Sequence, residues 1–127
     1  MNLSQTQIGN FNKDGYLFIP ELFSVDEVQT LRSDLPRIFS LDRDEIERDS
    51  ESNEVRLAAA MHEYSESFAS LLRHPRLINP AHQILGGDVY CHQYKVVTKE
   101  PFGQLDFPWH QDFASWHAHD GMPEPHA

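Results

Sequence analysis

The order of two hydrophobic patterns along the chain constrains its fold more than any other feature. The first two-thirds of the sequence carries apolar residues three or four positions apart, which predicts helices. From Asp88 to Thr98 the pattern changes to alternation, which predicts one long strand, and residues 107–113 are predicted to be a second extended segment. Helices followed by strands favour an α+β or mainly β domain, with a helical layer over about 1–86 and core strands over about 87–127, because βαβ units would alternate the two patterns.

Local signals predict where the individual elements begin and end. Ser24 and Glu27 have the spacing of a capping box, and Pro36 predicts the end of that helix or a kink in it. Gly86-Gly87 is a strong stop signal. The predicted elements are helices over Thr6–Lys13, Ser24 to about Pro36, Tyr64–Arg73 and Arg76–Leu85, a short strand over Tyr16–Ile19, and an irregular tail from His117 to Ala127.

Composition excludes several classes of protein. The formal net charge of −10 opposes binding to a phosphate backbone, so we expect no nucleic-acid partner. No stretch approaches the roughly 18 apolar residues needed to span a bilayer, and the N-terminal sequence lacks the pattern of a signal peptide. With one cysteine, Cys91, expected to be a buried inert thiol, a cytoplasmic location is the simplest interpretation. The acidic stretch from Leu41 to Glu54 is interpreted as a solvated loop or frayed helix, or alternatively as a mobile lid over a site.

The pentapeptide Trp109–Phe113 carries the strongest chemical signal. His110 and Asp112 are separated by one residue, so on extended backbone their side chains point to the same side and can bind one metal ion together. Imidazole and carboxylate are two of the three protein ligands in the facial triad that holds non-haem Fe(II) in oxygenases. Trp109, Phe113 and Trp116 are expected to form an apolar wall that excludes water from such a site.

Other residues near this motif have both functional and structural interpretations. Gln93 and Lys95 share one face of the predicted strand, where the amide can orient a polar substrate and the ammonium can pair with a carboxylate. Alternatively, Lys95 extends into solvent and the tryptophans are packing residues. His92, on the opposite face, is interpreted as a packing residue. A zinc-like site with His110 or Asp112 is a further alternative, using His117, His119, His126 and Asp120.

Three segments of the chain resemble the phytanoyl-CoA dioxygenase family, and within it the ectoine hydroxylases and hydroxylases of free amino acids. Residues 107–123 resemble the family's iron-binding signature, with a Trp-His-x-Asp-Phe-x-x-Trp run followed by Asp-Gly-Met-Pro. Asp88–Lys95 resembles the strand that precedes this signature, and the pattern from Asp14 to Ser24 is also typical of the family. The likeness extends over most of the chain, and the iron-binding segment is its specific part.

The resemblance implies a fold, a reaction and a set of site residues. The implied fold is a partial double-stranded β-helix, the cupin-like jelly roll, preceded by an N-terminal helical layer. The implied reaction is hydroxylation of a small ectoine-like or amino-acid-like substrate, using Fe(II), 2-oxoglutarate and O₂ and releasing succinate and CO₂. By the resemblance, the iron ligands are His110 and Asp112, the residues near 2-oxoglutarate are Lys95 and Phe107, and the substrate contacts are Gln93 and Trp116.

The sequence also departs from the family pattern. The family's second iron-binding His and the Arg that binds 2-oxoglutarate lie on later strands, and nothing in these 127 residues matches them. Val97 stands where an Asn is common. We therefore expect this chain to be the N-terminal part of a single dioxygenase domain. The alternatives are a truncated, catalytically inactive fragment or pseudo-enzyme, whose unpaired strand edges favour a homodimer, and a metal-free module that binds a sugar or another small molecule.

Overall fold

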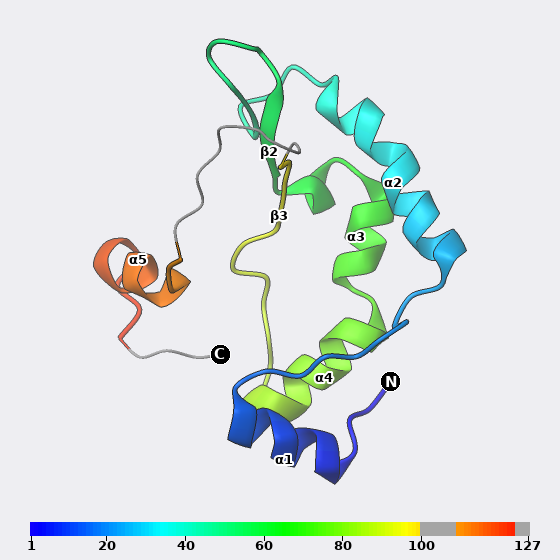
Figure 1. The fold of residues 1–127 in the computed structure, drawn as a ribbon, viewed down its shortest axis with the longest axis vertical. Helices are drawn as coiled ribbons and strands as arrows, with labels where there is room; N and C mark the ends of the chain where they lie inside the picture. Colours follow the sequence, from blue (N-terminus) through cyan, green and yellow to red (C-terminus); the bar gives the residue numbers. More distant parts are fainter. Residues whose placement is uncertain (100–108, 124–127) are drawn as a thin grey trace.

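Helices along one side of the molecule support a small antiparallel sheet at one end (Figure 1). The computed structural model describes residues 1–99 and 109–123. The architecture is α+β, as predicted. In chain order the elements are α1 (Gln5–Asp14), α2 (Val25–Phe39), β1 (Ile46–Arg48), β2 (Val55–Ala59), the 3₁₀ turn η1 (Met61–Glu63), α3 (Glu66–Leu72), α4 (Pro75–Leu85), β3 (Lys95–Val97) and α5 (Asp112–His119).

The four predicted helices form because their ends are specified locally. Ser24 caps α2 by accepting a hydrogen bond from the Glu27 backbone N–H at 3.2 Å, and the Glu27 carboxylate accepts one from the Ser24 N–H at 2.7 Å. The predicted capping box is therefore confirmed. Gly86 ends α4 in the left-handed conformation at φ 71°, which glycine adopts without a steric cost.

Pro36 does not end α2, which continues to Phe39. Proline removes one backbone donor, and the apolar burial in the turn that follows it offsets this loss. Ile38, which follows the proline, is 0 % exposed. Packing of Ile38 against the core therefore accounts for the helix extending past the residue that was predicted to stop or kink it.

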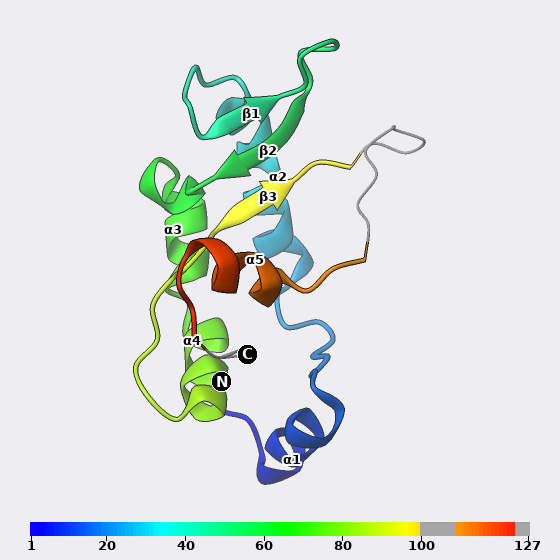
Figure 2. The ribbon, with the colours of Figure 1, turned by 90° about the vertical axis from the view of Figure 1, so that its left-hand side faces the viewer.

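The sheet has the order β1-β2-β3 with antiparallel pairs, in which Ile46 faces Ala58 and Leu57 faces Val97 (Figure 2). β1 lies inside the acidic stretch that was interpreted as a loop, frayed helix or lid. Its first residue, Ile46, is buried, so this stretch contributes a strand and a core residue between its exposed acids. Sequence patterns missed β1 and β2 because short strands are stabilised by pairing with distant residues.

The long strand predicted from Asp88 to Thr98 is reduced to β3, and residues 16–19 form no strand. Pairing along β3 stops where its partner turns away, because Ala60 directly after β2 adopts a left-handed conformation at φ 50° and leads into η1. Alternation holds within the short strand itself, since Val96 and the adjacent Tyr94 pack on the core while Lys95 is exposed.

A hydrophobic cluster joins α2, α3 and the sheet. Its buried members are Ile38, Ile46, Ala58, Met61 and Phe68. Within the part of the chain that the structure describes, no helix combines the length and apolar character required to cross a membrane.

Candidate functional site

His110 and Asp112 meet at the start of α5. Asp112 is the first residue of the helix, and Gln111 before it is extended, with φ −112° and ψ 126°. His110 Nε2 lies 3.1 Å from Asp112 Oδ1, and both side chains are about half exposed. The prediction that these two side chains point to the same side is confirmed.

The backbone that brings the pair together differs from the prediction. Residues 107–113 were predicted to be extended, but α5 begins at Asp112 and runs to His119, so the predicted irregular tail also begins later than expected. A carboxylate in the first turn is favoured by the helix dipole. The rings of Phe113 and His117, four residues apart, contact each other with centroids 5.5 Å apart, as the helical conformation allows.

The spacing of the pair fits two ligands of one metal ion. Protein nitrogen and oxygen ligands lie about 2.1 Å from a divalent transition metal, so two ligands at right angles are about 3 Å apart. The separation of 3.1 Å agrees with this value, and imidazole with carboxylate is a donor set that suits Fe(II). Among residues 1–99 and 109–123, no group of three candidate ligands is assembled, so this pair offers two candidate ligands.

The predicted apolar wall is only partly present around this pair. The Trp109 side chain is fully exposed, so in this chain it does not exclude water. Phe113 and Trp116 are partly buried. The residues directly before Trp109 lie outside the described part of the chain. The sequence beside Trp109 carries no signal that distinguishes a buried from an exposed ring.

The alternative zinc-like cluster is not assembled among the described residues. The Nδ1 atom of His117 lies 2.8 Å from the carbonyl oxygen of Met122, and the carboxylate of Asp120 faces His92. His126 lies outside the described residues. His117 and Asp120 thus contact different partners rather than one centre.

Gln93 and Lys95 are brought together at the start of β3. The ammonium group of Lys95 donates a hydrogen bond to Gln93 Oε1 at 3.3 Å, and both residues are exposed. Their predicted location on one face is therefore confirmed. Phe107, which was expected near the co-substrate together with Lys95, lies outside the described residues. Cys91, just before this pair, is exposed instead of buried, because the chain at that point does not belong to the sheet.

Trp116 joins α5 to the segment that leads into β3. Its ring contacts the His92 ring with centroids 5.1 Å apart and planes at 82°, an edge-to-face geometry. His92 was interpreted as a packing residue, and it does pack, but its partners were not predicted. Trp116 and Asp120 are one helical turn apart, so in a helix they lie on one face, but the sequence does not show which residue meets that face.

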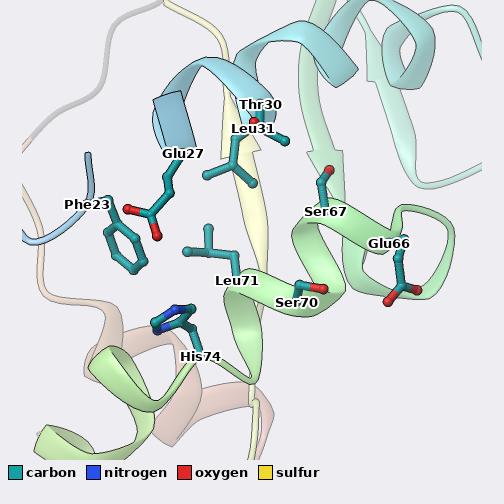
Figure 3. Close-up of a pocket in the computed structure, with 9 residues that line it drawn as sticks. All are labelled: Phe23, Glu27, Thr30, Leu31, Glu66, Ser67, Ser70, Leu71 and His74. Carbon is teal, nitrogen blue, oxygen red and sulfur yellow. The ribbon is translucent and has the colours of Figure 1, made fainter. Parts of the chain in front are cut away.

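A cavity of about 290 Å³ lies elsewhere, between α2, α3 and the start of α4 (Figure 3). Beside it, hydrogen bonds from Arg76 and then from the Ser24 backbone hold the pKa of Glu27 at about 2, well below its ordinary value of 4.5. None of the sequence-predicted site residues lines this cavity. Its lining is Phe23, Glu27, Thr30, Leu31, Glu66, Ser67, Ser70, Leu71 and His74.

Known proteins resemble this chain in both sequence and fold. The chain is 38% identical over 125 residues to an ectoine dioxygenase of Nocardia farcinica, covering 95% of this chain and 42% of that protein. It is 39% identical over 117 residues to an L-proline trans-4-hydroxylase of Streptomyces griseoviridis, covering 92% of this chain and 44% of that protein. The chain thus spans about two-fifths of the length of the curated relatives it matches.

Solved structures give the same result. The structure of EctD from S. alaskensis with 2-oxoglutarate and 5-hydroxyectoine superposes with a TM-score of 0.86 at 37% identity, covering 95% of this chain and 44% of that one. A structure of EctD from the same source with bound Fe gives a TM-score of 0.83 at 35% identity, covering 91% and 42%. Residues 11–127 match the family described as phytanoyl-CoA dioxygenase (PhyH), and the chain belongs to that family.

Proposed function

We propose that the whole protein of which these residues form a part is an Fe(II)- and 2-oxoglutarate-dependent dioxygenase that hydroxylates a small ectoine-like or amino-acid-like substrate. The observation that carries this proposal is the contact between His110 Nε2 and Asp112 Oδ1 at 3.1 Å. That contact occurs in a chain whose relatives include ectoine dioxygenases and a proline hydroxylase, and whose structural neighbours were crystallised with Fe and with 2-oxoglutarate.

His110 and Asp112 would supply two ligands to the iron. Iron bound with 2-oxoglutarate and O₂ supplies the oxidising chemistry that hydroxylates a C–H bond and releases succinate and CO₂. The work of the protein is to hold the reactants in position and to limit the access of water.

Lys95 and Gln93 are suited to binding charged and polar groups at this site. The ammonium of Lys95 donates to a neutral amide in this structure, and a carboxylate is a stronger partner for it. In the proposal, a carboxylate of 2-oxoglutarate replaces that amide at Lys95, with Phe107 beside the co-substrate. Gln93, released from Lys95, then presents both a donor and an acceptor to a zwitterionic substrate.

Trp116 would supply the apolar contact to the substrate. Its ring is partly buried and is held in an edge-to-face contact with His92, so its orientation is restricted. An indole ring is a large rigid surface that binds the aliphatic or cationic part of a small zwitterion. We further propose that the three-stranded sheet belongs to a double-stranded β-helix in the whole protein. The homodimer and the cytoplasmic location remain predictions from the sequence.

A second candidate is that the chain is catalytically inactive. The observation favouring it is that the described residues assemble two candidate metal ligands rather than three. In that case the 127 residues bind Fe(II) weakly, because two protein ligands form a poor iron site.

Succinate release provides the test of the proposed function. The protein as its gene encodes it is incubated with Fe(II), 2-oxoglutarate and O₂ plus ectoine, L-proline or other free amino acids, and substrate-dependent succinate is measured. We expect turnover with at least one of these substrates, loss of turnover in His110→Ala, and retention in the control His119→Ala, which changes an exposed histidine on the same helix. Absence of substrate-dependent succinate across the panel would remove the proposed function and favour the inactive alternative.

A further inference from the structure

The side chain of His92 lies between two aromatic rings and an acidic group. On one side its ring contacts Tyr90, with centroids 6.3 Å apart and planes at 86°. On the other side it meets the ring of Trp116 edge-to-face at 5.1 Å. Its Nε2 atom lies 3.6 Å from Asp120 Oδ2, an ion pair when the imidazole carries a proton. From the segment before β3, His92 therefore contacts Trp116 in α5 and Asp120, the residue that directly follows the helix.

Trp116 and Asp120, which His92 contacts, lie on the same side of the helix as Asp112, the proposed iron ligand. Asp112, Trp116 and Asp120 follow one another at intervals of four residues, which places them in one stripe along a helix. Because a short helix moves as a rigid unit, fixing Trp116 and Asp120 also fixes the direction of the stripe that begins with Asp112.

His92 is next to a proposed substrate contact in the sequence, so its contact with Trp116 affects the proposed substrate site. Its neighbour Gln93 is the proposed amide contact to the substrate, and Trp116 is the proposed aromatic contact. These two groups come from different elements, and the contact between the rings of His92 and Trp116 links those elements. We propose that His92 is a positioning residue that docks α5 against the segment before β3 and so sets the orientation of Trp116 relative to Gln93. This inference rests on the proposed function of Trp116 and Gln93.

The exposure of the side chains indicates which contact of His92 is the stronger, the ion pair with Asp120 or the ring contact with Trp116. The side chains of His92 and Asp120 are 33% and 46% exposed, so their ion pair is screened by solvent and contributes little. The edge-to-face contact with Trp116 is less sensitive to solvent and is the larger of the two. A phenylalanine at this position retains the ring contact and loses the ion pair, whereas an alanine loses both.

Fluorescence quenching tests the docking without any need for catalysis. Residues 1–127 contain two tryptophans, so in this 127-residue chain Trp109→Phe leaves Trp116 as the one remaining indole. With Trp109→Phe present, acrylamide quenching of Trp116 fluorescence is measured for the chain that keeps His92 and for His92→Ala, His92→Phe and the control His119→Ala. We expect the Stern–Volmer constant of His92→Ala to rise by at least about twofold, since loss of an aromatic pair shifts the ratio of docked to undocked α5 by roughly fivefold. His92→Phe is expected to lie closer to the unsubstituted protein than to His92→Ala, and His119→Ala to be unchanged.

Steady-state kinetics test whether the docking matters for the site. In the protein as its gene encodes it, His92→Ala is expected to raise KM for the organic substrate about fivefold, with KM for 2-oxoglutarate changed less than about twofold, which is the pattern of lost substrate binding. A general loss of structure would raise both constants. His92→Phe is expected to restore most of the substrate affinity.

Two results would overturn the proposal. One is an unchanged Stern–Volmer constant in His92→Ala, which would show that Trp116 does not depend on His92. The other is an equal rise of both KM values in His92→Ala and His92→Phe, which would assign His92 a general structural role. If the unsubstituted protein turned over no substrate, the proposed function would fail, while the quenching result would still decide whether His92 docks α5.

Discussion

Asp34 joins α2 to α3, and replacing it with asparagine tests how these helices are held together. Its carboxylate accepts hydrogen bonds from Arg37 Nε at 2.7 Å and Arg37 Nη2 at 3.1 Å, from Ser67 Oγ at 3.0 Å, and from Ser65 Oγ. These bonds, that from Arg37 first, hold the pKa of Asp34 at about 2, below its ordinary value of 3.8. The charged form is therefore more stable in the folded chain than in the unfolded chain.

The pKa gives the size of the effect. One pKa unit corresponds to about 1.4 kcal/mol, so the fall from 3.8 to about 2 corresponds to about 2 kcal/mol of folding free energy at neutral pH. The Asp34 side chain is 20% exposed, and screening by solvent reduces the expected contribution to roughly 1–2 kcal/mol. Because the pKa is lower in the folded state, this contribution is complete above about pH 4 and is lost as the pH falls through about 2.

Urea denaturation followed by helical circular dichroism measures this contribution. At pH 7, Asp34→Asn is expected to lower the free energy of unfolding by roughly 1–2 kcal/mol, and at pH 3 the difference from the unsubstituted chain should fall to about half. The matched control, Asp42→Asn, changes an exposed acid and should have an effect below about 0.5 kcal/mol. A difference for Asp34→Asn that is the same at pH 3 and pH 7 would show that the charge network contributes nothing and that only shape is lost.

Three further substitutions test the core, the cap and the co-substrate contact. Ile38→Ala removes a side chain that is 0 % exposed and should cost about 2–5 kcal/mol in urea denaturation; a cost below about 1 kcal/mol would contradict the assigned core. Ser24→Ala removes the acceptor for the Glu27 N–H and should cost about 1 kcal/mol in the same assay, whereas Ser24→Asp should cost almost nothing, and equal losses would argue against capping. Lys95→Met should raise KM for 2-oxoglutarate about tenfold, the loss of one charge-assisted contact, with KM for the organic substrate nearly unchanged; the reverse pattern would assign Lys95 to the substrate.

The predictable part of the fold is the part that local interactions specify. The cap at Ser24 and the end of α4 at Gly86 were foreseen because each signal acts within a few residues of the helix it bounds. β1 and β2 were missed because strands this short are defined by their partners, and β3 was predicted too long because Ala60, far away in the sequence, ends the strand that pairs with it. Alternation in the sequence can reveal which residues are able to form a strand, but not how many find a partner.

In the candidate site, too, the contacts within a short motif were predictable and the contacts between distant segments were not. His110 and Asp112 are neighbours within one short motif, so their proximity was foreseeable on extended backbone and also holds at a helix start. The contact between His92 and Trp116 was not foreseeable, because it depends on where α5 docks. Trp109 shows the limit of reasoning from residue type, since an aromatic residue next to a site residue is fully exposed in this chain.

The central claim is that His110 and Asp112 bind one ferrous ion together, and anaerobic titration with Fe(II) tests it most directly. The protein as its gene encodes it is titrated alongside His110→Ala, Asp112→Ala and the control His119→Ala. The claim predicts one equivalent of bound Fe(II), lost or weakened by at least about 100-fold in each of the first two variants, and unchanged in the control. Binding of one equivalent with the same affinity in all four proteins would contradict it.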